Sequence, residues 1–132
     1  MNIESIDKTK LATSGEEYRA LVGSDADWIA RSADDVWQVR EAGHGPFVKM
    51  PEADLRAFMA SLQFESGGLS TGSYRPLMAS LTLTDIFEVF ERFGMSRGYF
   101  LETHEAKCEG GTCSFDFWSF CSSVCGSSAK EE

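Results

Sequence analysis

The first 107 residues of this 132-residue chain contain no cysteine, although the whole chain has four. Proline and histidine are scarce as well, with three and two residues. No stretch approaches the roughly 18 apolar residues of a membrane-spanning helix, so the sequence predicts no membrane span. The first residues also lack the apolar core of about 7–15 residues found in secretory signal peptides. We therefore expect a chain that is cytoplasmic when made, where structural disulfides are disfavoured.

Positive charge is in short supply. The chain has 12 lysine and arginine residues against 21 aspartate and glutamate residues, and its formal net charge is −9. The basic residues form no cluster along the sequence. An acidic protein of this kind repels the phosphates of nucleic acids and of anionic membranes, so neither is an expected partner.

Short amphipathic segments are what the sequence has in abundance. Two runs with apolar residues at i, i+3, i+4 and i+7 predict core-facing helices: Leu55, Phe58, Met59 and Leu62 in the first, and Ile86, Val89, Phe90 and Phe93 in the second. Capping residues predict further helix starts at Ser14, Asp25, Ser32, Thr84 and Ser96. No segment alternates with a period of two for long enough to indicate a strand. The predicted fold class is all-α, a compact bundle of roughly five or six short helices with a Cys-rich C-terminal segment.

Changes in composition divide the chain into three regions. Residues 1–13 are polar and aperiodic and predict a flexible arm. Residues 14–107 hold the predicted helices and form the helical domain. Residues 108–132 are a tail rich in cysteine and serine, in which all four cysteines lie. Because the thiols are confined to this tail, we expect the chemistry of the protein there.

Metal binding is one interpretation of the tail. The spacing C-x4-C-x7-C-x3-C does not match the paired C-x2-C knuckles of most zinc sites. On helices, however, His104 and Cys108 would share one face, and so would Cys121 and Cys125. Zinc held by these four residues is therefore an alternative to the main prediction, which has no cofactor.

Disulfide bonding is a second interpretation. Phe117, Phe120, Cys121 and Val124 have helical spacing, so residues 114–125 predict a last amphipathic helix. Gly110 and Gly111 would form the turn before it. Four cysteines allow three connectivities, and the sequence does not choose among them.

Enzymatic modification is the third interpretation. Thiols and hydroxyl groups can be dehydrated, cross-linked or cyclised, and the tail is dense in both. The residues predicted to be modified or cross-linked are Cys108, Cys113, Cys121, Cys125, Thr112, Ser114, Ser119, Ser122 and Ser123. In this composition the chain resembles precursors of ribosomally synthesised and post-translationally modified peptides, which join a leader to a Cys/Ser/Thr-rich core.

The resemblance to these precursors implies specific partners and processing. The N-terminal region would be a leader recognised by a modifying enzyme, and Gly110-Gly111 resembles the double-glycine site at which exporters cut such leaders. The product would be a secreted, bacteriocin-like peptide. Cys108 beside His104 is a candidate activated thiol, but no third orienting residue or catalytic motif accompanies it, so we predict no enzyme activity. The leading hypothesis is a precursor protein. The alternatives are a small helical interaction domain stapled by disulfides and a Cys/His metal-binding protein.

Overall fold

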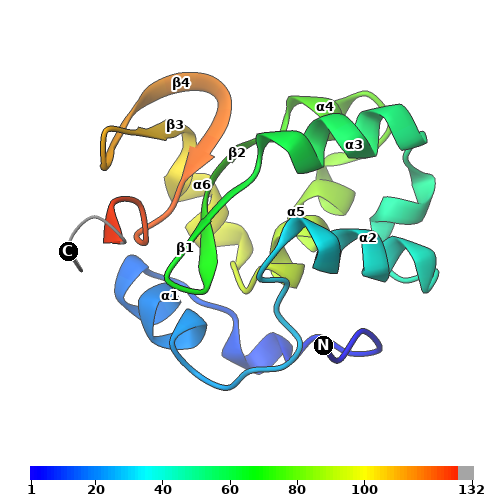
Figure 1. Ribbon diagram of the computed structural model, residues 1–132, viewed down its shortest axis with the longest axis horizontal. Helices are drawn as coiled ribbons and strands as arrows, with labels where there is room; N and C mark the ends of the chain where they lie inside the picture. Colours follow the sequence, from blue (N-terminus) through cyan, green and yellow to red (C-terminus); the bar gives the residue numbers. More distant parts are fainter. Residues whose placement is uncertain (128–132) are drawn as a thin grey trace.

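The computed structural model describes residues 1–127 as a mixed α/β fold (Figure 1). Its helices are η1 (Lys8–Lys10), α1 (Gly15–Val22), α2 (Ala33–Glu41), η2 (Pro46–Lys49), α3 (Glu52–Ser61), α4 (Arg75–Met78), α5 (Leu83–Arg92) and α6 (Arg97–Thr103). Its strands are β1 (Gln63–Glu65), β2 (Gly68–Ser73), β3 (His104–Glu109) and β4 (Thr112–Cys121). The strands form one antiparallel sheet in the order β1-β2-β4-β3. The all-α prediction is therefore wrong. None of the helices within residues 1–127 is long and apolar enough to cross a membrane.

Most helix starts lie where the capping residues predict them. Ser14, Ser32 and Ser96 each accept a hydrogen bond from the backbone N–H three residues later, which begins α1, α2 and α6. Helix α5 begins earlier than predicted, because Thr82 and Asp85 form a reciprocal capping box. The start predicted at Asp25 is wrong, since the chain between α1 and α2 contains no helix.

Both β-hairpins turn through two residues with positive φ. These are Ser66 and Gly67 between β1 and β2, at 52° and 84°, and Gly110 and Gly111 between β3 and β4, at 64° and 83°. Two-residue hairpin loops of this kind match the twist of the flanking strands, and glycine adopts the conformation without strain. The predicted turn at Gly110-Gly111 is confirmed, but it joins two strands, not two helices.

The core lies where the sheet meets the helices. The Phe90 ring of α5 stacks on Phe100 of α6, with ring centroids 4.3 Å apart, and lies edge-on to Phe120 of β4 at 4.8 Å. Among the residues predicted for the core, Leu55, Phe58, Ile86, Val89, Phe90 and Phe93 are buried, and Leu62 is partly buried. The C-terminal strand is thus packed onto helices α5 and α6.

The two terminal regions are built into the fold. Strand β4 is hydrogen-bonded between β2 and β3, and the β3–β4 hairpin lies on the far side of β2 from α3 and α4 (Figure 1). Residues 128–132 of the predicted tail lie outside the described residues. At the other end, within the segment predicted as an arm, the Asn2 N–H donates to the Asp27 carbonyl at 2.6 Å and the Ala12 N–H to the Gly94 carbonyl at 2.8 Å.

Candidate functional site

The four cysteines form two adjacent disulfides at the C-terminal hairpin. Cys108 of β3 and Cys113 of β4 lie directly opposite each other in the hairpin register. Cys121 ends β4, and Cys125 lies in the turns that follow. The bonds join Cys108 to Cys125 and Cys113 to Cys121, so all four thiols are paired. The hairpin is therefore stapled to the chain that follows it, with a connectivity that the sequence left open.

The structure brings together three of the four predicted zinc ligands, Cys108, Cys121 and Cys125, but not His104. The helices that would align His104 with Cys108, and Cys121 with Cys125, are replaced by strands and turns. His104 begins β3 opposite Phe120, at the other end of the strand from Cys108, and its ring contacts the Leu101 carbonyl. The predicted helix over residues 114–125 is likewise wrong. Cys113, which the zinc prediction omitted, lies beside the other cysteines instead.

The hydroxyl groups predicted for modification are held in the folded hairpin. Ser122 is 2% exposed, and its Oγ donates to the Leu69 carbonyl at 2.6 Å. The Ser123 Oγ donates to the Gly15 carbonyl at 2.8 Å, and the Ser119 Oγ to the Asp116 carboxylate at 2.6 Å. Thr112 and Ser114 are exposed near the hairpin tip. An enzyme would reach these two in the folded chain but would need local unfolding to reach Ser122.

A bulge in β4 projects aromatic side chains from the hairpin. Ala106 of β3 lies opposite Phe115, and His104 lies opposite Phe120. Residues 116–119 of β4 therefore lie beside one residue of β3, Glu105. Trp118 within the bulge has a φ of 67°. Phe115 and Phe117 are 68% and 62% exposed, and their rings meet edge-on at 4.8 Å. The bulge directs these rings to the surface while it returns Phe120 to the core.

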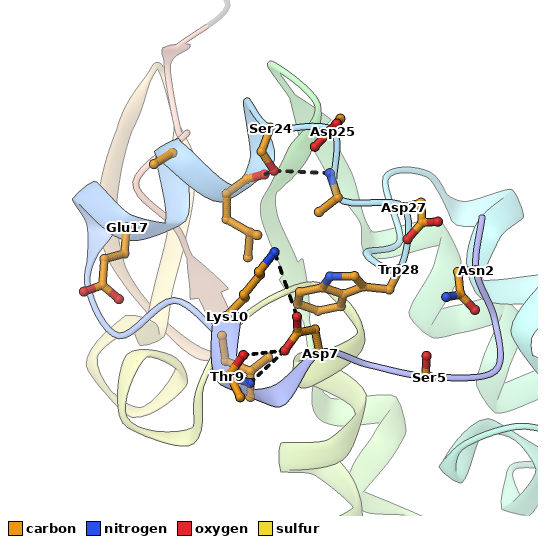
Figure 2. A pocket seen from close by; sticks show the side chains of 14 residues that line it. Asn2, Ser5, Asp7, Thr9, Lys10, Glu17, Ser24, Asp25, Asp27 and Trp28 are labelled. Carbon is orange, nitrogen blue, oxygen red and sulfur yellow. Dashed lines mark hydrogen bonds and ion pairs between the residues drawn. The ribbon is translucent and has the colours of Figure 1, made fainter.

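A second candidate site is a pocket of about 900 Å³ between the N-terminal segment, α1 and the loop that follows α1 (Figure 2). Four carboxylate side chains line it, Asp7, Glu17, Asp25 and Asp27, with a single basic side chain, Lys10. Apolar side chains including Leu11, Leu21 and Trp28 complete the lining. Acidic residues thus outnumber basic ones by four to one in a pocket of the size that small ligands occupy.

An arginine holds the loop that carries Asp25 and Asp27. The Arg31 guanidinium donates to four backbone carbonyls: Val22 at 2.5 Å, Ser24 at 3.0 Å, Ala26 at 3.2 Å and Gly67 at 2.9 Å. Three of these carbonyls belong to the loop and the end of α1, and the fourth belongs to the β1–β2 turn. This long-range contact gives the loop a defined shape without helical hydrogen bonds.

A second arginine holds the opposite wall of the pocket. Arg92 of α5 is 6% exposed, and burial lowers the pKa of its guanidinium. It donates to the carbonyls of Asn2 at 3.2 Å, Ile3 at 2.8 Å and Trp28 at 3.1 Å. The N-terminal segment is therefore tied to Trp28 through one buried cation. Both walls of the pocket are positioned in this way before any ligand binds.

Hydrogen bonds lower the pKa of two of the pocket carboxylates. The Thr9 hydroxyl donates to Asp7 at 2.6 Å and lowers the pKa of that carboxyl. The Thr13 backbone N–H and hydroxyl donate to Glu17 at 3.0 and 2.8 Å and lower its pKa as well. Lys10 lies 4.0 Å from Asp7 and offsets part of this charge. Asp25 and Asp27 have no side-chain hydrogen bond or ion pair with any other residue in the range 1–127.

Trp28 contributes a free hydrogen-bond donor to the pocket. The residue is only 5% exposed, and within the described part of the chain its indole Nε1 has no hydrogen-bond partner. Figure 2 shows the nitrogen-bearing edge of the ring facing the space between Lys10 and the Ser24–Asp27 loop. Within residues 1–127 the fully buried side-chain polar atoms without a partner are Arg40 Nε and Ser80 Oγ, so the Trp28 N–H is accessible from the pocket and can donate to an acceptor atom of a ligand.

The sequence pattern did not reveal this pocket. The run Asp25-Ala26-Asp27-Trp28 predicts the start of a helix, and nothing in the sequence around Arg31 and Arg92 indicates their long-range contacts. Comparisons with protein-family models, with curated protein sequences and with solved structures find no significant match.

Proposed function

We propose that the protein is a disulfide-stapled binding domain whose acidic pocket takes a lysine or arginine side chain of a peptide ligand. The observation that carries the proposal is the Trp28 indole N–H, free and accessible in the same pocket as the unpaired carboxylates of Asp25 and Asp27. The carboxylates attract a cation, and the N–H can donate to an acceptor atom. A basic peptide offers both groups, since a backbone carbonyl lies within a few bonds of its charged side chain.

The unpartnered N–H favours a peptide over a simple amine. A fully protonated polyamine carries cations but no good hydrogen-bond acceptor, so it would leave the Trp28 Nε1 without a partner. A buried polar group left unpaired on binding costs about 1–3 kcal/mol, which is a tenfold or larger difference in affinity. The pocket should therefore discriminate between the two kinds of cation.

The rigid frame around the pocket favours binding as its role. Arg31 and Arg92 hold its two walls through backbone carbonyls, so little conformational freedom remains to be lost when a ligand enters. The net charge of −9 would also draw a basic peptide toward the domain at low ionic strength.

The stapled hairpin supports a binding domain more than a precursor. A core peptide must enter the active site of its modifying enzyme, whereas Ser119 and Ser122 are buried here and the four thiols are paired. Disulfides persist in oxidising surroundings, and we infer that the domain works in such a compartment. The precursor hypothesis, with its modifying enzyme and exporter, stays a prediction.

Calorimetric titration with defined peptides tests the proposal. We expect the capped peptide Ala-Ala-Lys-Ala-Ala to bind saturably and to bind more weakly as salt rises, because the attraction is electrostatic. The matching peptide with glutamate in place of lysine should not bind. Spermidine should bind more weakly than the lysine peptide, because it leaves the indole N–H unpaired.

Two variants locate the binding in the pocket. The double change Asp25→Asn and Asp27→Asn should weaken peptide binding at least about tenfold. The matched control, Glu52→Gln with Glu102→Gln, removes the same charge from exposed positions on α3 and α6 and should leave binding unchanged. Trp28→Phe keeps an aromatic ring without the N–H, and should weaken the peptide but not spermidine. Equal losses in both double variants would show nonspecific charge attraction and overturn the proposal.

A further inference from the structure

The sulfur atoms of the two disulfides form one compact cluster. The Sγ atoms of Cys108, Cys121 and Cys125 all lie within 4.8 Å of one another, and Cys113 is bonded to Cys121. These residues come from β3, from both ends of β4 and from the turn after it. Three sulfurs therefore meet at one place and the fourth is bonded to one of them, although the four cysteines are spread over 18 positions of the chain, with sequence separations of 17 and 8 inside the two bonds.

Two oxygen atoms lie close to sulfurs of these disulfides. The Glu65 Oε2 lies 3.8 Å from the Cys108 Sγ, and the Ser122 carbonyl oxygen lies 3.9 Å from the Cys113 Sγ. A carboxylate and a carbonyl dipole raise the cost of forming bare thiolates at this place. The reduced sulfurs would be stabilised by a bound cation that prefers thiolate ligands.

We propose that the four cysteines hold one zinc ion when both disulfides are reduced. Tetrahedral zinc with Zn–S bonds of about 2.3 Å places its sulfur ligands about 3.8 Å apart, so the sulfurs of each cleaved disulfide must move apart while the more distant sulfurs of the cluster approach by about 1 Å. The ligand set is Cys108, Cys113, Cys121 and Cys125, and His104 has no part in it. The same hairpin is thus closed by two covalent bonds in oxidising surroundings and by a metal ion in reducing ones.

The two forms are connected by a balanced reaction. Two molecules of a dithiol reductant supply four electrons and four protons, which cleave both S–S bonds and yield four thiols, while each dithiol becomes a disulfide. Zinc binding then forms four Zn–S bonds and releases the four protons. The proposal is independent of peptide binding in the pocket, because the two sites share no residue.

Cobalt(II) is a suitable spectroscopic probe for the full chain. The protein is reduced with a phosphine, freed of reductant without air, and titrated with Co²⁺. We expect sulfur-to-cobalt charge-transfer absorption and the visible bands of a tetrahedral site, with saturation at one Co²⁺ per chain and displacement by Zn²⁺. The oxidised chain should give none of these bands.

Paired variants assign the ligands. Cys113→Ser should weaken Zn²⁺ binding by about 100-fold or more, since the loss of even an outer-shell partner costs about 10–100-fold. His104→Ala should leave the spectrum and the affinity unchanged. Circular dichroism of the reduced apo and metal-bound forms would show whether a variant has lost its fold. Three outcomes would each overturn the proposal. They are the absence of charge-transfer bands in the reduced wild type, saturation at one metal ion per two chains, and loss of the charge-transfer bands in His104→Ala.

Discussion

The hydroxyl oxygen of Tyr18 accepts a hydrogen bond from the backbone N–H of Leu69 at 2.8 Å, in the buried space between α1 and β2. The two residues are 51 positions apart, and both are 0% exposed. Leu69 lies in β2, which is an inner strand of the sheet, and Tyr18 lies in α1. This hydrogen bond therefore joins α1 to the sheet.

Replacement of Tyr18 by phenylalanine should destabilise the protein although the ring is retained. The Leu69 N–H would stay buried without a partner, while the Leu69 carbonyl would keep its bond from Ser122. We expect a loss of about 1–3 kcal/mol in the free energy of unfolding, measured by urea denaturation. A loss below a few tenths of a kcal/mol would mean that a water molecule replaces the hydroxyl.

The stability of the protein should fall at alkaline pH, in part through Tyr18. Burial raises the pKa of its phenol above the ordinary value of about 10, so the unfolded state releases the proton first. The stabilisation is complete below pH 10 and is lost as the pH rises toward the folded-state pKa. Denaturation at pH 8, 9.5 and 10.5 should therefore give a steeper decline for wild type than for Tyr18→Phe. Parallel declines would contradict this.

The two disulfides should contribute differently to stability. The Cys108–Cys125 bond closes a longer loop, of 17 residues, than the Cys113–Cys121 bond, of 8. From loop entropy we expect removal of the longer one by Cys108→Ser with Cys125→Ser to cost about 3 kcal/mol, and removal of the shorter one by the matching pair of changes about 2.5 kcal/mol. Denaturation without reductant measures both. The reverse order would show that native packing outweighs loop entropy here.

Gly126 should tolerate alanine less well than Gly110. Both glycines have positive φ, 80° and 64°, so alanine is strained at each. A methyl group at Gly126 would overlap the Gly111 carbonyl oxygen, whereas at Gly110 it would meet no atom. We expect Gly110→Ala to cost about 1 kcal/mol and Gly126→Ala clearly more, because backbone must move. Thermal unfolding compares them, and equal midpoints would disprove the clash.

The mass of the native protein separates the binding domain from the precursor. Two disulfides make the intact chain lighter than its reduced form by four hydrogen atoms, about 4 Da. We expect this shift on treatment with reductant, and no other modification. Loss of water in steps of about 18 Da, confined to residues 112–123, would instead support the precursor hypothesis.

The helices could be predicted from the sequence because their signals are local. A serine cap with its N–H partner three residues on, as at Ser32, fixes the start of a helix within one turn. The apolar stripe from Ile86 to Phe93 likewise carries its own period, and its core residues are buried as predicted.

The strands could not be predicted in the same way. Strand β2 reads Gly-Leu-Ser-Thr-Gly-Ser, and its small residues pack closely: a methyl group at Gly68 would meet Val22, and one at Gly72 would meet Phe120. In β4, the bulge at residues 116–119 shifts Phe120 to the core side and leaves Phe117 outside. The spacing of the apolar residues from Phe117 to Val124 therefore matches that of a helix, although residues 117–121 lie in a strand. The pocket escaped prediction for a related reason, since Arg31 and Arg92 shape it through carbonyls far away in the sequence.

The Cys108–Cys125 bond spans the Gly110-Gly111 turn, and it changes what a cut there would accomplish. Hydrolysis of the peptide bond after Gly111 would produce two fragments, one ending at Gly111 and one beginning at Thr112. Cys108 lies in the first fragment and Cys125 in the second, so both would migrate as one molecule on a non-reducing gel and separate only after reduction. A protease alone would nick this protein without liberating any part of it, and release of a C-terminal peptide would require a reductant as well.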